Sequence, residues 1–241
     1  MKTAFPFFQK SSVILSVISS LAFTSCVLAS EVVYSTDFEA PAFSSGQGFT
    51  QASIDGWVGN NNGTSILLQI TDEVSHSGKQ CLVESDQDTA DVPSAWHRFQ
   101  GRTLENAEVS FYVKMAAAET SFRIDFAGAA GVNFMVGHSF QPGMGSVGFW
   151  LKSGETVVKA TPDSAIAYNP TAWNKVSYKY NQSEKTFSIS VNDKEVLSLS
   201  KEEAAAVKLS ADRLRIATGW VAGSDPALKA YFDDLLITTN P

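Results

Sequence analysis

The sequence predicts an all-β protein, an antiparallel β-sandwich of two sheets with about a dozen strands. Three observations support this fold class. Apolar residues alternate with polar ones through most of the chain, clusters of Asn, Gly and Pro separate these runs, and only one short segment has helical character. Alternation with a period of two puts the apolar side chains of a strand on one face. Two such faces can be buried only if they pack against each other.

The first 29 residues are predicted to be a secretory signal peptide and are left out of the fold. Lys2 and Lys10 make a basic start, and residues 11–23 are apolar and small. Val27-Leu28-Ala29 provides the small residues that signal peptidase requires. The apolar run is too short and too rich in Ser for a helix that spans a membrane.

The predicted mature protein, residues 30–241, is a single domain that is secreted, periplasmic or displayed on the outer surface. A lipoprotein anchored through Cys26 is the alternative for its location. Once Cys26 is removed with the signal peptide, Cys81 has no cysteine to pair with. We expect Cys81 to be buried and inert, because it lies in a strand-like run.

The charge of the chain limits its partners. The formal net charge is −7, and removal of Lys2 and Lys10 takes it to −9. This charge argues against nucleic acid and against an anionic membrane surface. It also makes a strongly polyanionic glycan a less favoured ligand, unless a local basic cleft overrides the net charge. The sequence leaves the oligomeric state open.

Strands are expected at both ends of the mature domain and between them. The first run begins at Val33 and ends near the acidic pair Asp37 and Glu39. The central and late runs with clear alternation are residues 107–115, 121–126, 132–136, 147–151, 176–180, 187–191 and 195–199.

Two turn and cap signals between the late runs predict particular local structures. Asn192-Asp193 predicts a tight hairpin between two of them, because both residues tolerate positive φ. Ser200 and Glu203 have the spacing of a capping box before a short helix. The last run contains Tyr231-Phe232-Asp233-Asp234. In an antiparallel sandwich this last strand and the first one are often neighbours, so we expect their carboxylates to meet.

Four stretches together carry a family resemblance across nearly the whole mature domain. They are Asp37-Phe38-Glu39, residues 76–82, residues 173–178 with the hairpin that follows, and residues 231–234. On these stretches the chain resembles the concanavalin A-like lectin/glucanase superfamily and, within it, jelly-roll carbohydrate-binding modules. The resemblance implies a two-sheet jelly roll and a polysaccharide or other glycan as partner. The superfamily also contains hydrolases and lyases, so the fold alone does not settle the function.

The same resemblance implies a structural calcium ion. Related modules bind one with an acid near the first strand, backbone carbonyls of a turn and an acid in the last strand. The matching positions are Asp37 or Glu39, the backbone of residues 77–79, and Asp233. Calcium prefers such oxygen ligands. The alternative is that these acids are solvated strand ends.

Aromatic residues on the polar phase of a strand are the candidate glycan-binding residues. Flat aromatic rings cover the apolar C–H faces of sugars, while charged and amide groups bond their hydroxyls. If the strands concerned belong to one sheet, one outer face carries all the candidates. Three alternatives stay open. Loops cover the face and make it a second small core, a bulge in residues 94–100 turns Trp96 inward, or Arg123 and Asp125 pair with each other instead of contacting a ligand. The candidates are Trp96, Arg98, Tyr112, Arg123, Asp125 and Trp150.

No catalytic residue is predicted. The acidic strand pattern Glu-x-Asp-x-x-Glu of the related hydrolases is absent, and the three His residues are far apart in sequence. A non-catalytic carbohydrate-binding domain is therefore the leading hypothesis. A lyase or hydrolase is the first alternative, with a base and cations drawn from Tyr112, Lys114, Arg123 and His138. A structural domain of the cell envelope without a sugar ligand is the second.

Overall fold

A computed structural model describes most of the predicted mature domain. It covers residues 30–49, 54–60, 66–86, 94–118, 120–139, 148–160, 168–218 and 229–239. The predicted signal peptide, residues 1–29, and the alternative anchor Cys26 lie outside the described residues. Within the described ranges, no helix has the length and apolar character that crossing a membrane requires.

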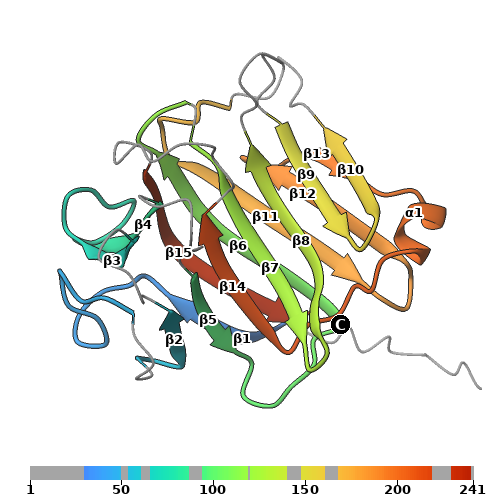
Figure 1. Cartoon of the computed structure of the whole chain (residues 1–241), viewed down its shortest axis with the longest axis horizontal. Coiled ribbons are helices and arrows are strands. Elements are labelled where there is room, and N and C mark those ends of the chain that lie inside the picture. The colour runs from blue at the N-terminus through green and yellow to red at the C-terminus, as the bar shows by residue number, and fades with distance from the viewer. Residues whose placement is uncertain are drawn as a thin grey trace, which may run out of the picture.

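Two antiparallel sheets pack face to face, as the sequence predicts (Figure 1). The sheet that holds both terminal strands is called sheet I. Its β1 (Glu31–Thr36) pairs with one half of β15 beside the main path of the sheet. Along that path the strands are β13 (Lys194–Ser198), β12 (Thr186–Val191), β11 (Asn174–Asn181), β6 (Asn106–Met115), β15 (Lys229–Thr239), β4 (Cys81–Asp86) and β3 (Ile66–Thr71).

Sheet II forms the other layer, and Figure 1 shows its central strands in front of those of sheet I. The one described helix, α1 (Lys201–Ala205), lies between β13 and β14 in sequence. The strands of sheet II are, in spatial order, β10 (Thr156–Ala160), β9 (Gly148–Ser153), β8 (Gly131–Ser139), β7 (Phe122–Gly128), β14 (Arg213–Thr218), β5 (Ser94–Arg98) and β2 (Trp57–Asn60).

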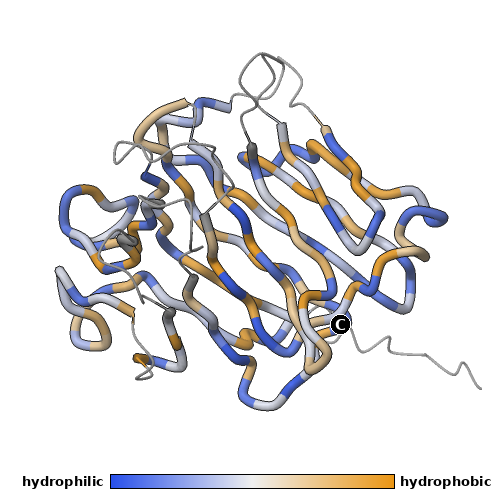
Figure 2. The backbone as a smooth tube through the Cα atoms, in the orientation of Figure 1, coloured by the Kyte–Doolittle hydropathy of each residue, from blue (hydrophilic) through white to orange (hydrophobic). Residues whose placement is uncertain are grey.

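The core lies between the sheets and is rich in aromatic rings. In β6 every second residue is buried, which confirms the alternation in the sequence; Figure 2 shows the same alternation of hydropathy along the strands. Phe126 and Phe134 stack with their ring centroids 4.4 Å apart, and Phe111 of sheet I meets Phe122 of sheet II edge-on at 6.0 Å. These inward rings remove apolar surface from water and hold the two layers together.

The first and last strands lie side by side, which confirms the expectation from the termini. β1 pairs with β15 antiparallel, with Thr36 opposite Leu235. The predicted details of the late strands are also present. Asn192 and Asp193 both have positive φ, 50° and 63°, in the β12–β13 hairpin, and the Ser200 and Glu203 capping box starts α1. Cys81 is buried, as predicted.

Two buried histidines should make the fold sensitive to acid. Burial lowers the pKa of His138 to about 3 and that of His97 to about 4, from an ordinary value of 6.5. The unfolded chain therefore binds protons below pH 6.5 that the folded protein does not, so stability is lost as the pH falls from 6.5 towards 4. Burial also raises the pKa of Asp233 to about 6, so this carboxyl group favours the folded state as the pH falls. It is one group, whereas two histidines act in the destabilising direction.

The expected result is a lower melting temperature at about pH 4 than above pH 6.5. His138→Phe removes one titrating group from an aromatic environment and should reduce this difference. A melting temperature that stays constant or rises on acidification would contradict the prediction.

Candidate functional site

Five of the six predicted glycan-binding residues lie on the outer face of sheet II. Trp96 projects outward from β5, because its neighbours Ala95 and His97 are buried in the core. The alternative that a bulge in residues 94–100 turns Trp96 inward is therefore wrong. Trp96 is paired with Val58 of β2 on one side and with Arg215 of β14 on the other. The other members are Arg98 on the same strand, Arg123 and Asp125 on β7, and Trp150 on β9.

Tyr112 does not belong to this face, so the expectation of one surface for all six residues needs correction. It lies on β6 of sheet I, and its ring stacks on the ring of His76 with a centroid distance of 3.4 Å. Trp173 meets the same imidazole edge-on at 5.7 Å. The turn around His76 thus covers Tyr112. The alternation places an outward residue on a face, but it does not say to which sheet that face belongs.

Asp125 organises the centre of the face. Its side chain is fully buried, although β7 points it outward. Arg215 donates from Nε to Asp125 Oδ2 at 2.7 Å, and its Nη2 also contacts this oxygen. On the other side, Arg123 Nε lies 2.8 Å from Asp125 Oδ1, an ion pair without the alignment of a hydrogen bond. The two guanidiniums shield the carboxylate from water, and each is about 20 % exposed.

The Trp96 ring is fixed by two arginines. The Arg215 guanidinium carbon lies 4.6 Å from the ring centroid, and that of Arg213 lies 5.4 Å away. Both distances are within the range of cation–π attraction. Arg213 also donates to the backbone oxygen of Gly128 at 2.8 Å. Neither arginine is among the candidates predicted from the sequence, although both alternate with the apolar Leu214 and Ile216 in the same way as those candidates alternate with their neighbours.

The indole of Trp150 fits over Gly137, where a side chain would collide with it. Gly137 of β8 lies directly between Arg123 and Trp150 in the register of the sheet. A Cβ atom on Gly137 would come within 2.9 Å of Trp150 Cζ2 and 3.1 Å of Cε2. The indole therefore packs against bare backbone, beside Arg123. Gly137 was also missed, because its role depends on a neighbouring strand.

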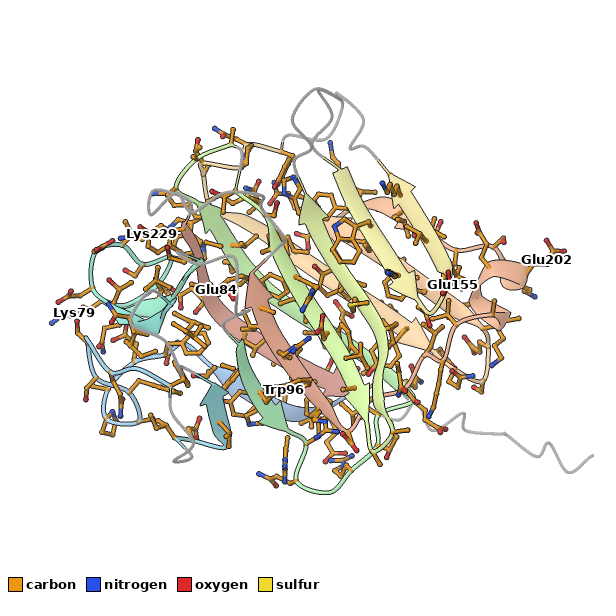
Figure 3. The ribbon with its side chains drawn as sticks, viewed as in Figure 1. Lys79, Glu84, Trp96, Glu155, Glu202 and Lys229 are labelled. Carbon is orange, nitrogen blue, oxygen red and sulfur yellow. The ribbon has the colours of Figure 1, made fainter. Side chains whose placement is uncertain are left out.

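The site is extended. Four strand-to-strand steps separate β5 from β9, so Trp96 and Trp150 are roughly 19 Å apart across the sheet. Figure 3 shows Trp96 over the strands of this layer. The chemistry that these residues offer is binding: rings for apolar faces and guanidinium donors for oxygen atoms. Asp125 is fully buried and both of its oxygens face arginines, so they are not available to contact a ligand.

Glu39 and Asp233, two of the predicted cation ligands, bind one turn of the chain at residues 76–80. Glu39 Oε1 accepts hydrogen bonds from the backbone N–H groups of Lys79 and Gln80 at 2.5 and 2.6 Å. These bonds lower the pKa of Glu39, although burial acts against them. Asp37 Oδ1 accepts from the backbone N–H of Glu39 at 3.1 Å.

Asp233 holds the other side of the same turn. Its Oδ2 accepts from the backbone N–H groups of His76 and Ser77 at 2.8 and 3.1 Å, and its Oδ1 accepts from that of Asp234 at 2.8 Å. The turn therefore presents N–H groups to these carboxylates, whereas the calcium hypothesis calls for carbonyls. The described residues contain no group of three side chains suited to a metal ion. Calcium stays a prediction, which melting curves with and without EDTA would test.

A hollow lies on the opposite side of the molecule, away from the outer face of sheet II. It has a volume of about 640 Å³ and opens over β11–β13 of sheet I. Its lining is polar, and its one aromatic ring, that of Phe187, belongs to the buried core. The hollow therefore lacks an aromatic platform, and we place the candidate site on sheet II. Polar lining residues include Lys179, Asn181, Glu184, Thr186, Ser188 and Glu195.

Comparison with solved structures identifies the architecture. A structure named cellulose induced protein, Cip1, matches 85% of this chain and 96% of its own, with 15% identity and a TM-score of 0.59. A Bacillus subtilis protein with a galectin-like fold matches 88% of this chain and 100% of its own, with 10% identity and a TM-score of 0.56. The fold is a concanavalin A-like jelly roll.

The jelly roll also occurs inside larger proteins. A sialidase matches 76% of this chain with 13% identity and a TM-score of 0.57, and the chain spans 17% of that sialidase. No protein-family model and no curated protein sequence matches the chain. At these identities the likeness establishes the jelly-roll fold, and the ligand has to be argued from the site.

Proposed function

We propose that this jelly roll is a non-catalytic carbohydrate-binding domain that holds a polysaccharide across the outer face of sheet II. The observation that carries the proposal is the pair of outward indoles, Trp96 and Trp150, on a face that also carries arginines and lysines. Sugars combine apolar C–H faces with hydroxyl groups, and such a surface complements both. The fold shared with a sialidase and a galectin-like protein supports a glycan ligand at a coarse level.

The positions of the residues considered for a lyase favour binding over catalysis. Tyr112 and Lys114 lie on β6 of sheet I, and Arg123 lies on the outer face of sheet II. His138 is fully buried among aromatic rings, and burial lowers the pKa of its imidazole to about 3. These four residues do not meet, so they offer no common site for a base and its supporting cations.

The proposal predicts that Trp150→Ala weakens binding. A stacked ring contributes roughly 0.5–1.5 kcal/mol beyond its buried area, so the loss of stacking alone should lower the affinity by about two- to twelvefold. Affinity electrophoresis in gels that contain a soluble polysaccharide measures this as lost retardation. Trp173→Ala is the matched control, because that indole lies on the opposite side, beside His76. Equal retardation of wild type and Trp150→Ala, or no retardation by any glycan, would refute the proposal.

A further inference from the structure

The outer face of sheet II carries an excess of positive charge that the whole chain does not have. The formal net charge of the chain is −7. The strands of sheet II nevertheless contain one carboxylate, the buried Asp125, against six cationic residues. All six lie on the outward phase of their strands. They are Arg98, Arg123, Lys152, Lys159, Arg213 and Arg215.

The opposite sheet shows that this excess is local. The strands of sheet I contain five lysines and seven carboxylates, so cations and anions are mixed there. The lysines are Lys114, Lys175, Lys179, Lys194 and Lys229, and the carboxylates are Glu31, Glu84, Asp86, Glu108, Glu195, Asp233 and Asp234. Positive charge is therefore segregated onto the face that also carries the two outward indoles.

The register of the strands makes the cations contiguous with the aromatic platform. Arg98 pairs with Arg213 across β5 and β14, next to Trp96. Lys159 pairs with Trp150 across β10 and β9. A ligand that covers either indole would therefore lie within reach of a cation on a neighbouring strand.

The carboxylates nearby do not neutralise the face. The single carboxylate of Asp125 forms ion pairs with two guanidiniums, those of Arg123 and Arg215, so one positive charge of this cluster is not neutralised. Arg213 has a longer contact with Asp212, 3.4 Å from Nε to Oδ1. Within the described part of the chain, Arg98, Lys152 and Lys159 take part in no ion pair. Like charges gathered in this way repel one another, and an anionic ligand removes that cost.

We infer that the ligand of this face is an acidic glycan, one whose sugar units carry carboxylate or sulfate groups; this rests on the carbohydrate-binding function proposed above. A guanidinium that contacts Asp125 through some of its N–H groups has other N–H groups left over. These can donate hydrogen bonds to the oxygens of a carboxylate or a sulfate. Arg123 is placed for this role beside Trp150, so one sugar unit can stack on the ring while its acidic group meets the arginine.

The net charge of the chain does not oppose this inference. Charges separated by more than the Debye length, about 8 Å at physiological ionic strength, are largely screened from each other. A ligand on the outer face of sheet II therefore responds mainly to the cations of that face. This is the local basic surface that overrides the expectation from net charge.

The test compares acidic with neutral glycans in affinity gels. The uronate probes are polygalacturonate and alginate, the sulfated probe is λ-carrageenan, which has no carboxylate, and the neutral probes are glucomannan and hydroxyethyl cellulose. Retardation is expressed as the ratio of mobilities with and without glycan, so that changes in the protein's own charge cancel. We expect retardation by an acidic glycan, with a steep loss as NaCl is added. Retardation by uronates alone assigns the group as carboxylate, and retardation by λ-carrageenan alone assigns it as sulfate.

Two charge variants locate the effect. The triple variant Arg98→Gln, Lys152→Gln, Lys159→Gln keeps both indoles and the Asp125 cluster, and should bind an acidic glycan at least about tenfold more weakly. The control Lys114→Gln, Lys179→Gln, Lys201→Gln removes the same charge from sheet I and α1, and should bind like the wild type. Equal weakening in both variants would overturn the inference, since the net charge alone would then explain binding.

The two proposals fail in different ways. Retardation by neutral glycans only, unaffected by salt and by the first triple variant, would overturn the acidic ligand and leave a carbohydrate-binding domain. Absence of retardation by every acidic and neutral glycan would overturn both.

Discussion

Asp125→Ala should reduce the free energy of unfolding by about 3 kcal/mol, the order expected when one partner of a buried ion pair is removed. Asp125 is fully buried between Arg123 and Arg215, whose side chains are about 20 % exposed. Without the carboxylate, the two closely spaced guanidiniums repel each other, and Arg215 loses its hydrogen-bond acceptor. Urea denaturation, followed by the change in midpoint, measures the loss.

A neighbouring acid provides the control. Asp212 contacts Arg213 at 3.4 Å, and both side chains are about a third exposed or less. Exposed pairs of this kind contribute roughly 0–1 kcal/mol, so Asp212→Ala should be almost neutral. If Asp125→Ala were no more destabilising than Asp212→Ala, the two arginines would not depend on Asp125 in the way described. Asp125→Ala should also abolish glycan retardation, because the guanidiniums lose their fixed positions.

Asp233→Ala should cost a comparable amount of stability, about 2–3 kcal/mol, for a different reason. Its carboxylate accepts the backbone N–H groups of His76, Ser77 and Asp234. Removal of the acceptor leaves partly buried N–H groups unpaired, which costs about 1–3 kcal/mol for each group that water cannot reach. Denaturation midpoints at a pH above 6 measure the effect, because the pKa of Asp233, raised by burial to about 6, makes the ionised form dominant there.

The same variant separates hydrogen bonding from metal binding. Asp37→Ala is the control, because Asp37 accepts one N–H bond at an exposed position and should matter little. If Asp233 acts through the backbone N–H groups, the loss in Asp233→Ala persists in EDTA. If EDTA makes wild type and variant equally stable, the carboxylate acts through a cation and our assignment to hydrogen bonds is wrong. Glycan retardation should survive in Asp233→Ala, since the outer face of sheet II is remote from this turn.

Much of the fold could be predicted because its signals are local. The alternation in residues 107–115 shows which side chains of β6 face the core, and Asn192-Asp193 and the Ser200 capping box act over a few residues. The phase of Trp96 and Trp150 follows from the same alternation. Tyr112 has an equally clear outward phase, yet the turn at His76 covers it.

The amino-acid sequence by itself determined the fold class, the adjacent terminal strands and the outward phase of two indoles. Only the tertiary structure decided that Arg213 and Arg215 lie beside Trp96, that Gly137 makes room for Trp150, and that Tyr112 belongs to the other sheet. The physical reason is the distance in sequence over which each feature is determined. Alternation is a property of neighbouring residues in one strand, whereas a binding face consists of strands far apart in sequence, which are brought together by the burial of their opposite sides.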